Sequence, residues 1–223
     1  MNRLFNQDNP VMKVLSKIFD IGWLSILYLL FCIPVITIGP ATTALYYTAI
    51  KVLRRERGYV WSEFFGCFKR EFKLGAILGI GFTLVYALLL FNLKYVGAAE
   101  GKYSGYLYGI YLAMIIIITC VLSYTFPVLS RLALSPAKVL RLALYLSIRH
   151  FSFTIIHVAI LAAGVVASWY GFILGIPIVL LVIPGGLALL YTLPMEVILK
   201  KYQPQEKEIV TEDGEVITAW YNE

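Results

Sequence analysis

Residues 21–50 read IGWLSILYLLFCIPVITIGPATTALYYTAI, thirty consecutive residues without a charged side chain. A helix of about 20 apolar residues is long enough to cross the hydrocarbon layer of a bilayer. The stretch is therefore a membrane segment, and it is longer than one crossing requires. Three more uncharged stretches follow, at residues 74–93, 103–130 and 151–195. The sequence thus predicts an all-α, integral-membrane helical bundle.

The composition of the whole chain agrees with a membrane protein. Of the 223 residues, 60% are hydrophobic and 14% are charged, whereas a typical soluble domain has about half apolar and about a quarter charged residues. This balance excludes a soluble enzyme and a disordered regulator. Basic residues at the cytoplasmic ends of membrane helices explain the net charge of +6. We therefore expect the lipid bilayer, and no nucleic acid, as a partner.

Two prolines and a glycine interrupt the first uncharged stretch, at Pro34, Gly39 and Pro40. Proline inside a helix removes a hydrogen bond and clashes with the preceding turn, but it is well placed at the first helical position. We therefore predict one helix at about 11–33 and a second, short helix at about 40–54. The second helix spans only about 22 Å at 1.5 Å per residue. It is expected to be tilted, re-entrant or bordered by a thinned bilayer.

The last uncharged stretch has 45 residues, which is too long for one crossing. Polar and bend-prone residues occur at 168–171. The stretch is therefore expected to split into helices at about 151–170 and 172–195. Together with helices at 74–93 and 103–130, this division predicts six transmembrane helices.

Lysine and arginine residues decide the orientation, because membrane insertion retains them on the cytoplasmic side. With six helices, 17 of the 19 basic residues lie on the side that holds both termini. With five helices, the division is 14 against 5. We therefore predict six crossings with both termini in the cytoplasm, and five crossings is the rival topology.

Two cytoplasmic segments have the patterns of amphipathic helices. Phe64, Phe68 and Phe72 recur at four-residue spacing, which is typical of a helix lying on an anionic membrane surface. Ser135 and Pro136 supply the N-cap and first-turn proline of a second helix, which carries a basic stripe. The basic residues of both segments form a candidate surface for a partner or for lipid headgroups: Lys69, Arg70, Lys73, Lys138, Arg141 and Arg149.

After residue 202 the composition becomes acidic, which separates a cytoplasmic tail at 203–223 from the membrane domain at 1–202. Two short apolar pairs in the tail flank Asp213-Gly214, a residue pair typical of β-hairpin turns. We predict a short hairpin here. It needs the membrane domain or a partner for stability, because an isolated hairpin is marginal in water.

Candidate structural or path-lining residues lie where the predicted helices are interrupted or carry a polar group. Broken helices are tolerated where their freed carbonyls face protein or a wet cavity, and an ionisable residue within a span is a functional candidate. His157 and His150 lack a third ligand in sequence, so we predict no metal site. The candidates are Pro34, Thr37, Gly39, Pro40, His157, Pro184, Gly185 and Gly186.

Motifs for common catalytic chemistry are missing from the sequence. It has no Gly-x-Ser-x-Gly elbow, no His-Glu-x-x-His and no Walker loop. The predicted spans also hold no Asp or Glu deep in the hydrocarbon, which argues against a proton- or sodium-coupled pump. We therefore expect no enzyme activity, no catalytic residues and no cofactor.

Small residues indicate where helices approach one another closely. Gly-x-x-x-Gly pairs occur near helix ends at residues 75 and 79, 105 and 109, and 171 and 175. Such pairs allow close contact between helix backbones. They support a compact bundle and, equally, a homodimer.

Three stretches share a family pattern: Pro34-Val35-Ile36-Thr37-Ile38-Gly39-Pro40-Ala41, Phe64-Phe65-x-x-Phe68-Lys69-x-x-Phe72-Lys73 and Phe126-Pro127-Val128-Leu129-Ser130-Arg131. They resemble the YesL-like family of bacterial membrane proteins, a domain of unknown function without established site residues. The resemblance spans almost the whole membrane part but not the acidic tail. Members of that family look like polytopic inner-membrane proteins, often encoded beside carbohydrate ABC importers and sensor-regulator systems. The resemblance thus implies a bacterial plasma membrane and an importer or sensor protein as a partner.

Three functional hypotheses follow. The leading one is a non-enzymatic multi-pass membrane protein that is accessory or regulatory to carbohydrate uptake and acts through its basic cytoplasmic loops and tail. The alternative is a small transporter in its own right, as a single chain or a homodimer, in which the two interrupted sites line a path. A lipid-modifying enzyme ranks third, because no catalytic constellation supports it.

Overall fold

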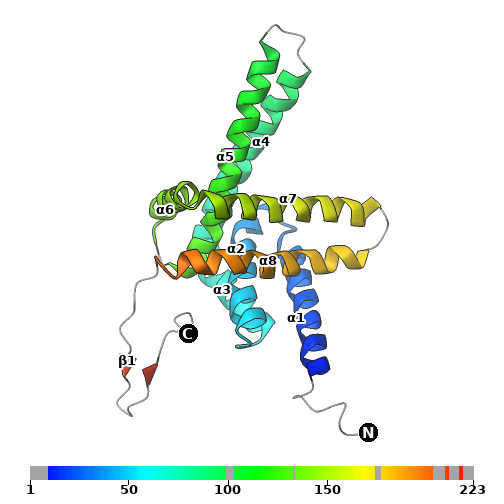
Figure 1. The fold of residues 1–223 in the computed structure, drawn as a ribbon, viewed down its shortest axis with the longest axis vertical. Coiled ribbons are helices and arrows are strands. Elements are labelled where there is room, and N and C mark those ends of the chain that lie inside the picture. The colour runs from blue at the N-terminus through cyan, green and yellow to red at the C-terminus, as the bar shows by residue number, and fades with distance from the viewer. Residues whose placement is uncertain are drawn as a thin grey trace.

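The structure is a computed structural model, and it describes residues 10–98, 103–132, 134–173 and 177–202 together with the pairs 209–210 and 216–217 (Figure 1). The helical elements, in chain order, are α1 (Pro10–Phe31), the 3₁₀ turn η1 (Val35–Thr37), α2 (Ile38–Thr48), the π-helical segment η2 (Ala49–Arg54), α3 (Val60–Arg70), α4 (Phe72–Gly97), α5 (Ser104–Arg131), α6 (Pro136–Arg149), α7 (Phe151–Ile173) and α8 (Pro177–Leu199). The two strands are β1 (Ile209–Val210) and β2 (Val216–Ile217).

Within this part of the chain, five helices are long and apolar enough to cross a membrane. They are α1 over Val14–Phe31, α4, α5, α7 over Phe151–Gly171 and α8 over Val182–Leu199. This finding confirms a helical membrane fold. The predicted second crossing is not among the five, because α2 has only 11 residues and its π-helical continuation only six.

Helix α2 lies in the middle of the molecule rather than against lipid. It contacts α1, α3, α4, α5 and α8, and most of its residues are buried. Two of its threonines are fully buried, and Thr43 donates its hydroxyl to the carbonyl of Gly39 at 3.0 Å. The short helix is therefore the core around which the longer helices pack.

Glycines decide how α2 meets α4. The corner predicted at Thr37 to Pro40 is a 3₁₀ turn that leads directly into α2, with Pro40 in the first turn of that helix. A Cβ on Gly39 would lie 2.0 Å from the carbonyl oxygen of Gly75, and a Cβ on Gly79 would lie 2.9 Å from the Cα of Gly39. Only residues without a Cβ permit this contact between two backbones.

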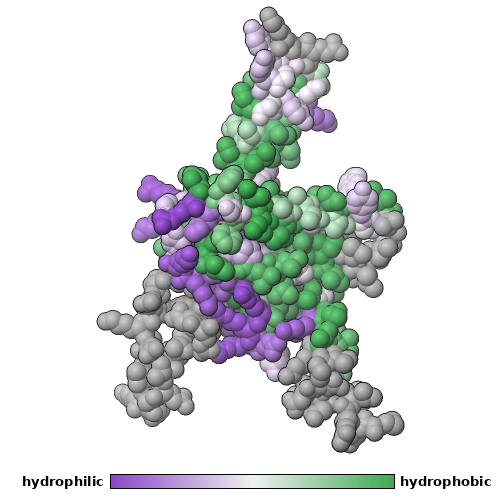
Figure 2. Space-filling view, viewed as in Figure 1, coloured by the Kyte–Doolittle hydropathy of each residue, from purple (hydrophilic) through white to green (hydrophobic). Residues whose placement is uncertain are grey.

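The long helices form two hairpins. Helices α4 and α5 run side by side as one hairpin, and α7 and α8 run side by side as the other. Figure 1 shows that the two hairpins extend in clearly different directions from the region of α2 and α6. Figure 2 shows hydrophilic residues gathered at the end of the molecule where α3 and α6 lie, whereas the long faces of the hairpins are mostly hydrophobic.

The amphipathic helix predicted around Phe64 exists as α3, but its apolar face does not lie on lipid. The rings of Phe64 and Phe68 are 1% and 8% exposed, and they lie 5.5 Å and 4.7 Å from the ring of Phe31 on α1. Phe72 is partly exposed. The prediction of a membrane-surface stripe was wrong for Phe64 and Phe68, because α1 covers their side of the helix.

The tail contains two paired segments. Strands β1 and β2 are antiparallel, with Ile209 opposite Ile217 and Val210 opposite Val216. The predicted turn at Asp213-Gly214 lies outside the described residues.

Candidate functional site

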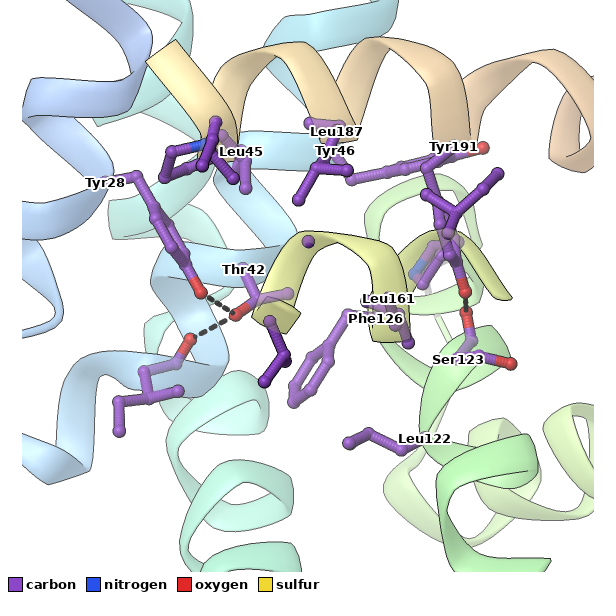
Figure 3. A pocket seen from close by; sticks show the side chains of 18 of the residues that line it. Tyr28, Thr42, Leu45, Tyr46, Leu122, Ser123, Phe126, Leu161, Leu187 and Tyr191 are labelled. Carbon is purple, nitrogen blue, oxygen red and sulfur yellow. Dashed lines mark hydrogen bonds between the residues drawn. The ribbon is translucent and has the colours of Figure 1, made fainter. Parts of the chain in front are cut away.

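A cavity of about 900 Å³ lies between the two hairpins, and we call it the inter-hairpin cavity (Figure 3). Helices α1, α2, α4, α5, α7 and α8 all contribute to its wall. Figure 3 shows Tyr28 and Thr42 at one end, Tyr191 and Ser123 at the other, and apolar side chains such as Leu161 between them. The cavity is therefore assembled from helices that lie far apart in the sequence.

The inner wall is buried and the outer rim is exposed. Leu45, Tyr46 and Tyr191 line the inner part and are at most 9% exposed. Val165 and Trp169 on α7 also line the cavity, but they are 71% and 66% exposed. The cavity therefore opens beside the exposed face of α7, one of the five helices that are long and apolar enough to cross a membrane.

Hydroxyl groups supply most of the polarity of the wall, and several of them donate hydrogen bonds to other groups of the protein. Thr42 donates to the carbonyl of Ile38 at 2.7 Å, and Thr83 donates to the carbonyl of Gly79 at 2.8 Å. Tyr191 donates to the carbonyl of Ser123. No charged side chain lines the cavity within the described ranges. The wall thus offers an apolar surface with few hydrogen-bond donors.

A cluster of ionised groups joins α5 to α8, and we call it the α5–α8 ion-pair cluster. Glu196 accepts hydrogen bonds from Arg131, and from Arg55 at 3.4 Å. The side chains of Arg131 and Glu196 are 1% and 5% exposed. Arg54 adds a donor to the carbonyl of Thr192 at 3.0 Å. Buried charges are stable only when paired, so this cluster requires α5, α8 and η2 to keep their relative positions.

His157 is fully buried behind the cavity. Its ring lies 5.4 Å from the ring of Tyr124 on α5 and 4.2 Å from the ring of Tyr191 on α8. Tyr124 in turn bonds to Thr154 on α7, with 3.0 Å between the two hydroxyl oxygens. His157 therefore packs between the two hairpins and is not among the residues that line the cavity.

The predicted path-lining residues have different positions. Pro184 lines the cavity, whereas Gly39 and Pro40 pack on α4. Pro34 is exposed, and its carbonyl accepts the hydroxyl of Thr37 at 2.7 Å. Of the predicted path-lining residues at the corner, none lines the cavity with Pro184, although Ile38 between them does.

The break predicted at Pro184 to Gly186 is not a break in the helix. Helix α8 continues through Pro184, and the N–H of Gly185 donates to the hydroxyl of Ser25 on α1 at 2.8 Å. A Cβ on Gly185 would lie 2.5 Å from the carbonyl oxygen of Ile21, while Gly186 has open space around it. The proline-glycine site therefore allows α8 to approach α1 closely.

The predicted basic residues all lie on the exposed surface: Lys69, Arg70, Lys73, Lys138, Arg141 and Arg149. We call this set the basic surface. Arg70 forms an ion pair with Glu71 at 2.8 Å, and its guanidinium lies 5.2 Å from the ring centre of Tyr47. Arg149 donates to the hydroxyl of Tyr145. These contacts hold two of the six cations in place at the surface.

The sequence did not predict that the residues of the α5–α8 ion-pair cluster lie together and form ion pairs. Arg131 directly follows the predicted helix at 103–130, and Glu196 directly follows the predicted helix at 172–195. Opposite charges at the ends of two predicted spans were the available signal. It was not sufficient, because the sequence does not show which two of the spans are neighbours.

Comparison with known proteins gives one family match. Residues 21–93 match the family described as "Protein of unknown function, DUF624". The match runs from α1 to α4 and confirms the expected likeness to a family of unknown function, but it does not carry the name YesL-like. No curated protein and no solved structure matches the chain.

Proposed function

We propose that this chain, with its region similar to a family of unknown function, is a non-enzymatic multi-pass protein of a bacterial plasma membrane. In this proposal it is accessory or regulatory to carbohydrate uptake and acts by binding a partner at its cytoplasmic end. The supporting observation is the basic surface, which α3, the first turn of α4 and α6 present at the hydrophilic end of the molecule (Figure 2). The carbohydrate role rests on the family resemblance of the sequence.

The structure of α3 and α6 suits partner binding. Each helix packs one face against the rest of the protein. Phe64 belongs to the buried face of α3, and Leu146 belongs to the buried face of α6. Their outer faces also expose large side chains: Trp61 stacks on Phe65 with 6.1 Å between ring centres, and Tyr145 is 44% exposed. Aromatic and arginine side chains supply much of the binding energy in protein interfaces.

Six crossings with both termini in the cytoplasm form part of the proposal. Lys17 near the start of α1 pairs with Glu56 after η2 at 2.7 Å. Glu196 near the end of α8 pairs with Arg55, also after η2, and with Arg131 at the end of α5. These ion pairs support a common side for all four chain segments. A chain that leaves that side along α1 then has to return along α2 and η2.

Charge reversal on α6 tests partner binding. We expect a Lys138→Glu and Arg141→Glu double variant to lower the recovery of importer subunits about tenfold after cross-linking in native membranes, equivalent to about 1.4 kcal/mol of binding. The matched control is Lys94→Glu, which changes an exposed lysine at the far end of α4. Purification of the wild-type chain from cross-linked membranes without any importer or sensor subunit would reject the proposal.

The second candidate function is transport, and the inter-hairpin cavity favours it. A cavity of about 900 Å³ between two hairpins that are joined mainly at one end has the size of a small-molecule site. Uptake of radiolabelled sugars into proteoliposomes tests this function. Uptake no faster than in protein-free liposomes across a broad sugar panel would exclude a sugar transporter.

A further inference from the structure

We propose that the inter-hairpin cavity binds the acyl chain of a membrane phospholipid, which enters sideways between the α4–α5 and α7–α8 hairpins. This inference is independent of partner binding at the basic surface. Three features of the cavity support a hydrocarbon chain as its ligand: the wall, the opening and the inner end.

The wall suits a hydrocarbon chain better than a sugar, so this inference competes with sugar transport through the same cavity. Thr42 and Thr83 donate their hydroxyl protons to backbone carbonyls of their own helices. Within the described segments, no charged side chain lines the cavity. A sugar would bury many hydroxyls without partners in such a wall, and each unpaired buried hydroxyl is unfavourable. An acyl chain has no polar group to satisfy and gains contact with every apolar residue of the wall.

The opening places the cavity in contact with lipid. Val165 and Trp169 belong both to the cavity wall and to the exposed face of a membrane-crossing helix. Across the opening, Phe82 and Thr83 belong to α4, which is also a membrane-crossing helix. Apolar cavities of this kind exclude water, and phospholipid chains are the most abundant apolar molecules around such a helix. The volume of about 900 Å³ falls within the range of known ligand pockets, about 300–1,000 Å³.

Two tyrosine rings line the inner part and limit how far a chain enters. Tyr46 and Tyr191 are 4% and 9% exposed, and their rings meet edge to face with 6.4 Å between centres. Tyr191 is held in place because it donates to the carbonyl of Ser123 on α5. Buried aromatic rings present an apolar face to the chain, so we place the methyl end of the chain beside them.

Photolabelling in vesicles of stated composition tests the site. The purified chain is reconstituted into phosphatidylglycerol and phosphatidylethanolamine vesicles that contain a phosphatidylglycerol with a diazirine halfway along one acyl chain. After illumination, mass spectrometry locates the labelled residues. We expect labels on Leu161 and Ser168, which line the cavity.

A cavity-filling variant and its neighbour provide the control. Thr83→Trp places a large ring in the cavity, whereas Leu84→Trp places the same ring on the lipid-facing side, where Leu84 is 65% exposed. We expect Thr83→Trp to lower labelling of Leu161 about tenfold, as loss of about 1.4 kcal/mol of binding would, and Leu84→Trp to leave it unchanged. Ser168→Trp, with Val166→Trp as its control, repeats the comparison on α7 if Thr83→Trp does not fold.

Three outcomes would overturn the inference. One is equal labelling of Leu161 in the cavity-filling variant and its control. Another is a free diazirine fatty acid that displaces the phospholipid label at equimolar amount, because the site would then bind free fatty acid. The last is a dimer that dissociates on Thr83→Trp, because a second copy of the chain would then occupy the cavity. Loss of importer binding in the α6 variant would leave the labelling unchanged, so the two proposals fail separately.

Discussion

Glu196 is the residue on which the contact between α5 and α8 depends most. It is 4% exposed and accepts hydrogen bonds from Arg131 and Arg55. A buried ion pair adds little net stability when it is complete, but removal of one partner leaves an uncompensated buried charge. The carboxylate therefore contributes less as a source of stability than as the counter-charge of the buried Arg131 and the partly buried Arg55.

Glu196→Gln should destabilise the protein strongly. We expect a loss of about 3–5 kcal/mol of unfolding free energy, because the buried guanidinium of Arg131 loses the carboxylate of its ion pair with Glu196. Glu56→Gln is the control, since the pair of Glu56 with Lys17 is exposed and exposed pairs contribute about 0–1 kcal/mol. Denaturant unfolding in detergent micelles measures both. Equal losses in the two variants would show that the cluster does not depend on burial.

Cys67 should be a poorly reactive thiol. It is 1% exposed on α3, and burial raises its pKa to about 12, despite the nearby guanidinium of Arg70. A raised pKa keeps the thiol protonated, so at pH 8 only about one part in ten thousand is the reactive thiolate, and reactivity grows as the pH rises toward 12. Maleimide labelling measures this, with the exposed Ser62→Cys as the fast control. Labelling of Cys67 at the control's rate in folded protein would contradict the burial of that face.

At the scale of the elements, the contact of α2 with α4 and the contact of α8 with α1 follow one rule. Gly39 and Gly75 allow the first contact, and Gly185 allows the second. Helices approach closely where a glycine leaves room for the neighbouring backbone. By contrast, the predicted contact face at Gly105 and Gly109 has open space around it, so the Gly-x-x-x-Gly pattern alone does not decide which helices touch.

Gly39→Ala should weaken the core while Gly81→Ala should not. The new methyl group at residue 39 would overlap the backbone of Gly75, and overpacking of this kind costs about 1–3 kcal/mol. Gly81 lies within α4 with nothing near its Cβ position, so alanine there should be neutral or stabilise the helix by up to about 1 kcal/mol. Thermal unfolding followed by circular dichroism compares the two. A Gly39→Ala protein as stable as Gly81→Ala would refute the close contact.

At the scale of the whole molecule, one hydrophilic end and two diverging hairpins define the architecture (Figures 1 and 2). The ion pairs of Glu196 and of Lys17 lie among the chain segments assigned to the cytoplasmic side. The hairpins touch through Tyr191 and Ser123, Tyr124 and Thr154, and the ring of His157. The contact of Tyr191 with Ser123 closes one end of the inter-hairpin cavity, and the rest of the cavity extends from there between the helices.

Cysteine accessibility tests the six-crossing topology. In a background with the three native cysteines replaced by serine, Arg3→Cys should react only after the membrane is permeabilised, because the N-terminus is expected in the cytoplasm. The six-crossing topology places the C-terminal end of α4 outside the cell. Lys94→Cys at that end should therefore react with a membrane-impermeant maleimide in intact cells. Reaction of Arg3→Cys in intact cells would instead favour five crossings.

The sequence by itself determined the class of the protein and the limits of most helices. Uncharged stretches of about 20 residues or more predict membrane helices because the bilayer has a fixed thickness, and the described helices follow them closely. Even the short helix at 40–54 appears, as α2 with η2. These features are local. They depend on the hydropathy of each residue and on the backbone conformations that proline allows, and both are properties of single residues.

Only the tertiary structure decided which helices meet and what lies between them. Lipid is as apolar as a helix surface, so hydropathy does not distinguish a face that contacts lipid from one that contacts protein. Phe64 was therefore assigned to the membrane surface although α1 covers it. Arg131 and Glu196 form an ion pair although they are 65 residues apart in the chain. Both this ion pair and the cavity depend on how the hairpins are placed in space. Packing between segments that are distant in the sequence sets the placement of the hairpins, so it cannot be predicted from any short stretch of the sequence.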